Sequence, residues 1–197
     1  MKSNTLTIRK MTFCAIFTAL IAVGAFIKIP VPPIPFTLQT MFVVLAGLML
    51  GGNMGGISAL LYMILGLIGI PIFTGGGGIG YVLKPTFGYI IGFCVGAYAI
   101  GKISYKNGKL GGYARMFCGV LAGLGIIYGF GIIYYYFITN FVTSSYPGFW
   151  FMILHCFLMT IPGDLITCAL ACLLAKRVHP VTGRYIYKNC LLYTSDA

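Results

Sequence analysis

The chain has 197 residues, of which 59% are apolar and only 8% are charged, and its mean hydropathy is +0.98. A typical soluble domain is about 45 to 50% apolar and about 25% charged, so this composition excludes an ordinary soluble domain and predicts an all-α, multi-pass membrane protein. The formal net charge is +11, from 13 Lys and Arg against two acids. The position of these charges decides whether a nucleic-acid partner has to be considered.

Six apolar runs follow one another along the chain, separated by clusters of Pro, Gly or Lys. They cover residues 11–29, 36–50, 56–73, 87–103, 113–139 and 149–175. A helix needs about 20 mostly apolar residues to cross the hydrocarbon layer. We therefore expect six transmembrane helices in a single integral membrane domain, residues 1–197. The second run is short for a spanning helix, so we expect it to be tilted or only partly inserted.

The loop after the third apolar run is rich in glycine, with four successive glycines at 75–78 and Lys84 shortly afterwards. Such a segment predicts either a mobile lid or a concave set of backbone N–H groups that can receive an anionic or amide-bearing ligand. A plain connector is the alternative. The glycines lack the Gly-Lys-Ser/Thr ending of a P-loop, so we expect no nucleotide site.

The basic residues segregate strongly in the predicted topology. All but two of the 13 Lys and Arg residues fall on the side that holds both termini, and the other side holds only Lys28 and Lys84. Short cytoplasmic loops retain basic residues, so we expect both termini to be cytoplasmic and the glycine-rich loop to lie outside. Topology and attraction to anionic membrane lipid then explain the charge, and we expect no nucleic-acid partner.

Asp164 is the acid on which a functional interpretation depends, because the other acid, Asp196, lies in the C-terminal tail. Asp164 falls inside the sixth predicted helix, where a charged side chain costs about 2.5 kcal/mol or more on insertion scales. Intramembrane acids therefore usually face a cavity or a partner, and the Pro-Gly pair directly before this one can open the helix. The structural alternative is a protonated Asp164 hydrogen-bonded to Thr160 or Thr167.

The sequence lacks paired carboxylates, a Ser/His/Asp set, a zinc-binding His-Glu-x-x-His motif and a nucleotide motif. An ATPase is thereby excluded, and the chain shows no energy source of its own. The seven cysteines include no Cys-x-x-Cys pair, so we expect no metal site. We predict a binding protein with no cofactor and no enzymatic activity. The alternative from another class is a small intramembrane enzyme that uses Asp164 as a lone base.

Small residues recur at four-residue spacing, a pattern that lets membrane helices approach closely. Internal packing is a sufficient explanation for most of them, including the pairs Gly119/Gly123 and Gly125/Gly129. Ala15 and Ala19 in the first helix have two interpretations. They pack internally, or they present a flat patch to another membrane protein.

Several blocks of sequence, taken in order along nearly the whole chain, resemble one known family. They lie at residues 22–30, 33–40, 66–73, 84–93 and 162–164, and the most specific are Pro-Phe-Thr-Leu-Gln-Thr at 35–40 and Pro-Thr-x-Gly-Tyr at 85–89. The chain resembles the BioY family, the biotin-specific substrate-binding (S) component of energy-coupling factor transporters. Other vitamins, such as riboflavin or thiamine, remain alternative ligands.

The resemblance implies a six-helix S component in the cell membrane, with a biotin pocket near the outer surface between loops 1–2 and 3–4. It also implies partners, namely a transmembrane coupling subunit that docks on Ala15 and Ala19 and two cytoplasmic ATPase subunits that supply energy.

For the site, the resemblance implies that Asp164 contacts the ureido ring of biotin. Many family members carry Lys three residues after this Asp, whereas this chain has Thr167. We expect Lys84 and the amides of the glycine loop to hold the valerate carboxylate. The expected biotin-binding residues are Gln39, Gly75, Gly76, Gly77, Lys84, Tyr89 and Asp164.

Overall fold

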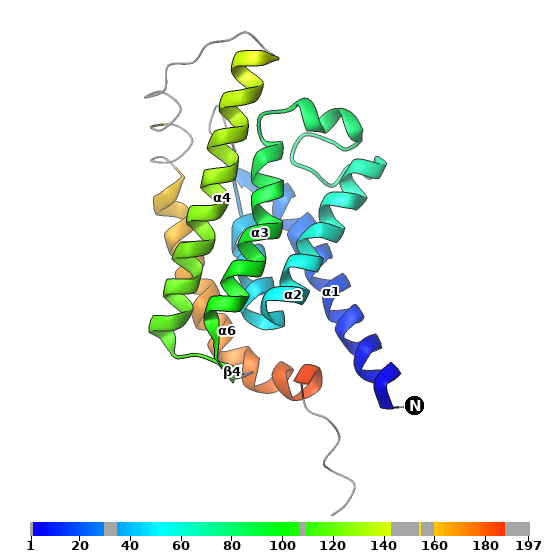
Figure 1. Ribbon diagram of the computed structural model, residues 1–197, viewed down its shortest axis with the longest axis vertical. Helices are drawn as coiled ribbons and strands as arrows, with labels where there is room; N and C mark the ends of the chain where they lie inside the picture. Colours follow the sequence, from blue (N-terminus) through cyan, green and yellow to red (C-terminus); the bar gives the residue numbers. More distant parts are fainter. Residues whose placement is uncertain (1, 30–34, 107–108, 143–153, 155–159, 188–197) are drawn as a thin grey trace, which may run out of the picture.

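The computed structural model describes residues 2–29, 35–106, 109–142, 154 and 160–187, and this part of the chain is mostly helical (Figure 1). Its long helices are α1 (Lys2–Phe26), α2 (Gln39–Ile68), α3 (Phe87–Ser104), α4 (Tyr113–Phe141) and α6 (Ile161–Tyr187), and η1 (Ile79–Leu83) is a short 3-10 helix. Two short antiparallel hairpins join them. Strand β1 (Lys28–Ile29) pairs with β2 (Phe36–Thr37), and β3 (Tyr105–Lys106) pairs with β4 (Lys109–Leu110).

Four of the described helices are long and apolar enough to cross a membrane. These candidate spans are Ile8–Phe26, Gln39–Ile68, Phe87–Ser104 and Tyr113–Val142. Their outward faces carry large exposed apolar side chains such as Ile16, Val23 and Ile133, which suits contact with lipid. The predicted helical fold class is confirmed, since the described residues are mostly helical. The count of six helices and the orientation of the termini stay predictions, and residues 149–153 and 155–159 of the sixth predicted helix lie outside the described residues.

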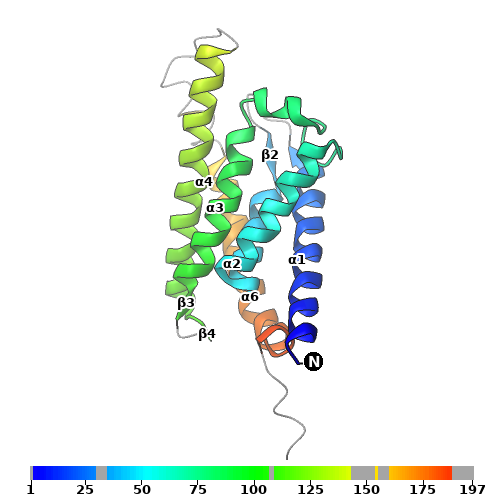
Figure 2. The same ribbon diagram turned by 45° about the vertical axis from the view of Figure 1, so that its right-hand side comes forward.

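Helix α2 contains most of the second and third predicted helices, joined at a sharp break. Gly51 has φ 75° and ψ 176°, a non-helical conformation that glycine adopts without a steric penalty. A Cβ atom added to Gly55 would lie 2.9 Å from the carbonyl oxygen of Ala46, although nine residues of straight helix would separate them by about 13 Å. The chain therefore folds back on itself, and the two halves of α2 form a V in Figures 1 and 2.

The second half of α2 ends at Ile68, before the predicted end at residue 73. Gly69 adopts φ 118° and caps the helix in the left-handed conformation, with its N–H on the carbonyl oxygen of Gly66. Pro71 then cannot continue the helix. This early end frees residues 70–78 to form a loop whose conformation matters for the pocket below.

The two ends of the molecule differ in charge. The start of α1, the β3–β4 hairpin and the end of α6 lie together at the lower end in Figures 1 and 2, and the β1–β2 hairpin, the glycine-rich loop and η1 lie at the upper end. The lower elements and the adjoining ends of α3 and α4 carry most of the described basic residues, namely Arg9, Lys10, Lys102, Lys106, Lys109, Arg115, Lys176 and Arg177, whereas the upper end carries Lys28 and, directly after η1, Lys84. The two groups of loops separated by charge in the sequence therefore lie at opposite ends of the fold.

Close helix contacts depend on glycine at several places. A Cβ on Gly101 of α3 would lie 2.1 Å from the backbone nitrogen of Gly52, and one on Gly92 would lie 2.9 Å from Ile127 of α4. In contrast, a Cβ on Gly125 or Gly129 would meet nothing within 4 Å. Gly119 and Gly123 face Ser104 and Ile100 of α3, so internal packing explains that pair as expected, but the same expectation is wrong for Gly125 and Gly129, which lie on an open surface of α4.

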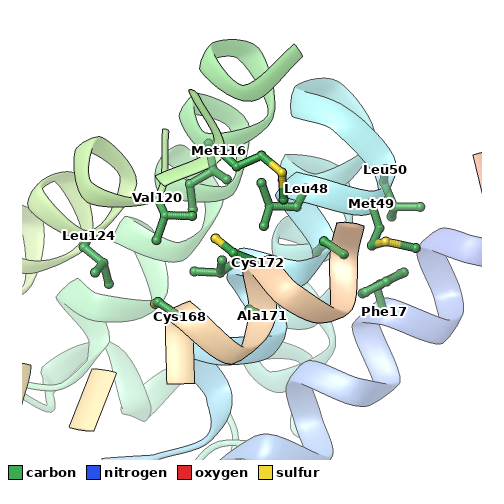
Figure 3. Close-up of a cluster of buried hydrophobic side chains, with 14 of the residues drawn as sticks. Phe17, Leu48, Met49, Leu50, Met116, Val120, Leu124, Cys168, Ala171 and Cys172 are labelled. Carbon is green, nitrogen blue, oxygen red and sulfur yellow. The ribbon is translucent and has the colours of Figure 1, made fainter. Parts of the chain in front are cut away.

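A cluster of buried side chains fills the interior between α1, α2, α4 and α6 (Figure 3). Three of its members are free cysteines, Cys14, Cys168 and Cys172, which act as small packing residues.

At the lower end of the fold, Tyr105 of β3 connects α2 with α6. Its hydroxyl lies 3.1 Å from the Leu48 carbonyl oxygen and 2.8 Å from Nε2 of His179 on α6.

Candidate ligand-binding pocket

A pocket of about 620 Å³, counting the space open to solvent, lies among the upper ends of the helices. Helices α2, α3, α4 and α6 all contribute to it, together with β2 and the glycine-rich loop. Its walls mix aromatic and aliphatic side chains with hydroxyl groups and one carboxylate. The lining residues are Pro35, Phe36, Thr37, Gln39, Thr40, Tyr62, Thr74, Tyr81, Thr86, Tyr89, Ile90, Phe93, Ile127, Tyr128, Thr160 and Asp164.

Asp164 lies in this pocket and is only 5% exposed. The hydroxyl of Tyr128, on α4, donates to Asp164 Oδ2 at 2.5 Å and lies 2.9 Å from Oγ1 of Thr160. Thr40 lies beside the same carboxylate. The other oxygen, Oδ1, is buried and accepts no hydrogen bond from the described residues. Half of this carboxylate is therefore held in place, and half is left for a ligand.

The start of α6 explains how Asp164 reaches this position. In the described part of the chain the helix begins at Ile161, so the Pro-Gly pair lies in its first turn, where a missing N–H breaks no intrahelical bond. A Cβ on Gly163 would lie 2.6 Å from the ring of Phe36, so glycine lets α6 approach the pocket wall. Because the carboxylate is also in the first turn, the helix dipole favours its negative charge.

Thr167 does not contact the Asp164 side chain through its hydroxyl. Its Oγ1 donates to the backbone carbonyl oxygen of Asp164 at 3.0 Å. The position that holds Lys in many related sequences is thus occupied here by a residue that bonds its own helix. Tyr128, from another helix, supplies the hydrogen bond that fixes the carboxylate.

Two further predicted residues meet Asp164 in the same pocket. Gln39 begins α2 and is 4% exposed, and its Nε2 is buried without an acceptor among the described residues. Tyr89 of α3 packs edge-on against Tyr128, with ring centroids 6.0 Å apart. The predicted residues Gln39, Tyr89 and Asp164 are therefore brought together, although they lie on three different helices.

Lys84 and the predicted glycines lie beside the pocket rather than in its lining. Lys84 Nζ donates to the Gly75 carbonyl oxygen at 2.7 Å and lies 4.8 Å from the centre of the Tyr81 ring, which does line the pocket. The Gly76 N–H donates to the Phe73 carbonyl oxygen at 3.1 Å. The Gly78 N–H donates to the Gly66 carbonyl oxygen at 2.7 Å. The amides of Gly76 and Gly78 are therefore used within the loop and against the end of α2, so the loop is a folded rim in this conformation.

Lys28 also reaches this rim. Its Nζ donates to the carbonyl oxygen of Thr74 at 2.9 Å, and the Thr74 hydroxyl lies 2.9 Å from the hydroxyl of Tyr81. The two lysines of the upper end thus hold two consecutive carbonyl groups, those of Thr74 and Gly75. The sequence indicated Lys28 only as a topology marker, and its contact with the glycine-rich loop becomes visible only in the fold.

Tyr128 is the pocket residue that sequence reasoning missed with the largest consequence. Tyrosine in membrane helices is enriched at the two interfaces, and Tyr128 lies in the middle of a long apolar helix. A tyrosine at that depth needs a hydrogen-bond partner. This mismatch between residue type and depth is the signal that would have found it.

The fold and the site define a class: a multi-pass membrane protein with a partly polar pocket between its helices near one end. Comparison with known families agrees with this class. The model of the BioY family matches residues 1–184, and the chain belongs to the BioY family, which confirms the resemblance seen in the sequence.

Individual relatives support the same assignment. Over 91 residues the chain is 60% identical to a probable biotin transporter BioY of Lysinibacillus sphaericus, a match that spans only 46% of each protein. Over 177 residues it is 32% identical to the biotin transporter BioY of Rhizobium etli, and this match covers 86% of this chain and 92% of the relative. Its fold is similar to a solved S-component for biotin from an ECF-type ABC transporter, with a TM-score of 0.72 and 29% identity over 88% of this chain and 92% of that one. These relatives are transporters and not enzymes.

Proposed function

We propose that this protein captures biotin from outside the cell and delivers it across the cell membrane as the substrate-specific component of an energy-coupling factor transporter. Biotin is the cargo, and no cofactor takes part. The observation that carries the proposal is the buried Asp164 carboxylate, which keeps one oxygen available inside a pocket lined by aromatic, aliphatic and hydroxyl side chains.

The chemistry of biotin fits the pocket part by part. Its ureido ring carries two N–H donors, which suit the available oxygen of Asp164, and a carbonyl oxygen, which suits the Gln39 amide. Its fused sulfur ring is apolar and suits the walls formed by Phe93 and Ile127. Its valerate chain ends in a carboxylate, and Lys84 lies beside the pocket on the aromatic ring of Tyr81.

The choice of vitamin is tested by thermal unfolding of the purified protein with biotin, riboflavin or thiamine at equal concentration. A ligand that binds only the folded state stabilises it by about 2.7 kcal/mol at 100 times its Kd. We expect biotin alone to raise the Tm. A rise with riboflavin or thiamine and none with biotin would assign the pocket to that other vitamin.

Lys84→Ala is expected to weaken binding of biotin but not of biotin amide, which lacks the negative charge. Hydrogen bonds to charged groups contribute about 1.5 to 3 kcal/mol, so the loss for biotin should be about tenfold or more. Competition binding with both ligands measures the difference, and Lys28→Ala is the matched control because that lysine holds the neighbouring carbonyl. An equal loss for both ligands in Lys84→Ala would refute the charge pairing.

The complete transporter needs partners. We propose that a transmembrane coupling subunit docks on Ala15 and Ala19, and that two cytoplasmic ATPase subunits supply the energy that this chain cannot. Both alanines are exposed on α1, beside the exposed Ile16. We further propose six transmembrane helices with both termini in the cytoplasm.

A further inference from the structure

We infer that the Asp164 end of the pocket accepts a positively charged ligand group, so that the protein binds cyclic guanidines in addition to cyclic ureas. The inference rests on the proposed function and deepens it. A suitable probe is 2-iminobiotin, which differs from biotin only in carrying a guanidinium in place of the urea at neutral pH.

The first observation is that no described residue in the pocket places a positive charge beside Asp164. Apart from Asp164 itself, every described residue that lines the pocket is uncharged. The groups beside its carboxylate are the hydroxyls of Tyr128 and Thr40. The nearby lysines point elsewhere, since Lys84 and Lys28 donate to carbonyl groups of the glycine-rich loop.

The second observation is that the carboxylate is only half satisfied. Tyr128 donates to Oδ2, but Oδ1 is buried and accepts no hydrogen bond from the described residues. A buried carboxylate without a positive partner is costly, and a cation within about 4 to 6 Å favours its charged form. A guanidinium brings the N–H donors of a urea and also supplies the missing charge.

The opposite side of the ligand ring raises one apparent conflict. Where biotin has a carbonyl oxygen, 2-iminobiotin has an N–H donor, and a fixed donor in the pocket would repel it. Gln39 removes this conflict because its amide carries both a donor and an acceptor, and rotation of the amide by half a turn exchanges them. The buried Gln39 Nε2 has no acceptor within hydrogen-bond geometry among the described residues, and the neighbouring Tyr62 hydroxyl can serve either as donor or as acceptor to the rotated amide.

Thr167 offers a matched variant. It lies three residues after Asp164 on the same face of α6, so a lysine there can provide an internal positive partner for the carboxylate. Thr167→Lys should therefore repel the guanidinium while leaving the neutral urea acceptable. Thr167→Met has a similar length and no charge, and it controls for size.

The experiment is competition of labelled biotin by unlabelled biotin and by 2-iminobiotin at neutral pH. In the wild type we expect 2-iminobiotin to bind at least as tightly as biotin. In Thr167→Lys we expect it to bind at least tenfold more weakly than biotin, and in Thr167→Met to match the wild type. Weaker binding of 2-iminobiotin than of biotin in the wild type overturns the inference, and this comparison needs no variant to fold.

The outcome also separates this inference from the proposed function. If labelled biotin itself does not bind the wild type, the proposed function fails. If biotin binds and 2-iminobiotin does not compete, the function stands and only the positive-ligand inference is rejected.

Discussion

Asp164→Asn is expected to weaken binding of labelled biotin by well over tenfold. In the proposed complex the carboxylate accepts on both sides, from Tyr128 at Oδ2 and from the ligand at Oδ1, which accepts no hydrogen bond from the described residues. An amide replaces one of these acceptors with an NH₂ donor, which then faces either the Tyr128 hydroxyl or a ureido N–H. Hydrogen bonds to a charged group contribute about 1.5 to 3 kcal/mol each, and about 1.4 kcal/mol is a tenfold change in affinity.

Equilibrium binding to the purified protein measures this effect, and two controls make it specific. Thr167→Val removes a hydroxyl that bonds only the backbone of α6, so its biotin affinity should stay close to that of the wild type. The Tm of Asp164→Asn without ligand should not fall sharply, because the variant removes a buried charge and its amide oxygen can still accept from the Tyr128 hydroxyl. Wild-type affinity in Asp164→Asn would refute the role assigned to this residue.

The second large effect is expected at the outer face of α1. Changing both Ala15 and Ala19 to Leu should reduce co-purification with a co-expressed coupling subunit at least tenfold. Both side chains are exposed, and small residues at this spacing let the backbones of two membrane helices approach closely. Leucine side chains would hold the partner helix away.

Biotin binding serves as the internal control for this double variant, since neither alanine lines the pocket. Ala122→Leu provides the matched control for added bulk, because Ala122 is exposed on α4. It should leave co-purification unchanged. Undiminished capture of the coupling subunit by the double variant would show that docking takes place on another surface.

Much of the fold could be predicted because hydropathy determines which segments enter a membrane. The break between residues 50 and 56 was expected from its glycines, but the helix resumes directly after Gly51, so the connection is a single non-helical residue. Local composition cannot reveal this, because the sharp turn also depends on α3, where Gly101 allows contact with Gly52.

The site could be predicted only in part, for a related reason. Asp164 was found because an acid in an apolar segment is expensive, and Gln39 and Tyr89 were found through the family resemblance. Tyr128 was missed because its partner lies on another helix, 36 residues away. The hydrogen bond from Lys84 to the Gly75 carbonyl oxygen could not be predicted either. A sequence shows that a cation lies near a loop, but it does not show which atom the cation binds.

The contacts of Tyr105 have a consequence for the route of the ligand. Its hydroxyl joins the break in α2 to His179 near the end of α6. The buried cluster of Figure 3 includes Leu48 near this junction and also Leu124 and Cys168, which lie four residues, about one helical turn, from the pocket residues Tyr128 and Asp164. In the described part of the chain, the pocket is therefore closed toward the lower end of the fold. A ligand cannot leave through that packing in this conformation, so delivery across a membrane requires the packing to come apart or the whole protein to change its orientation.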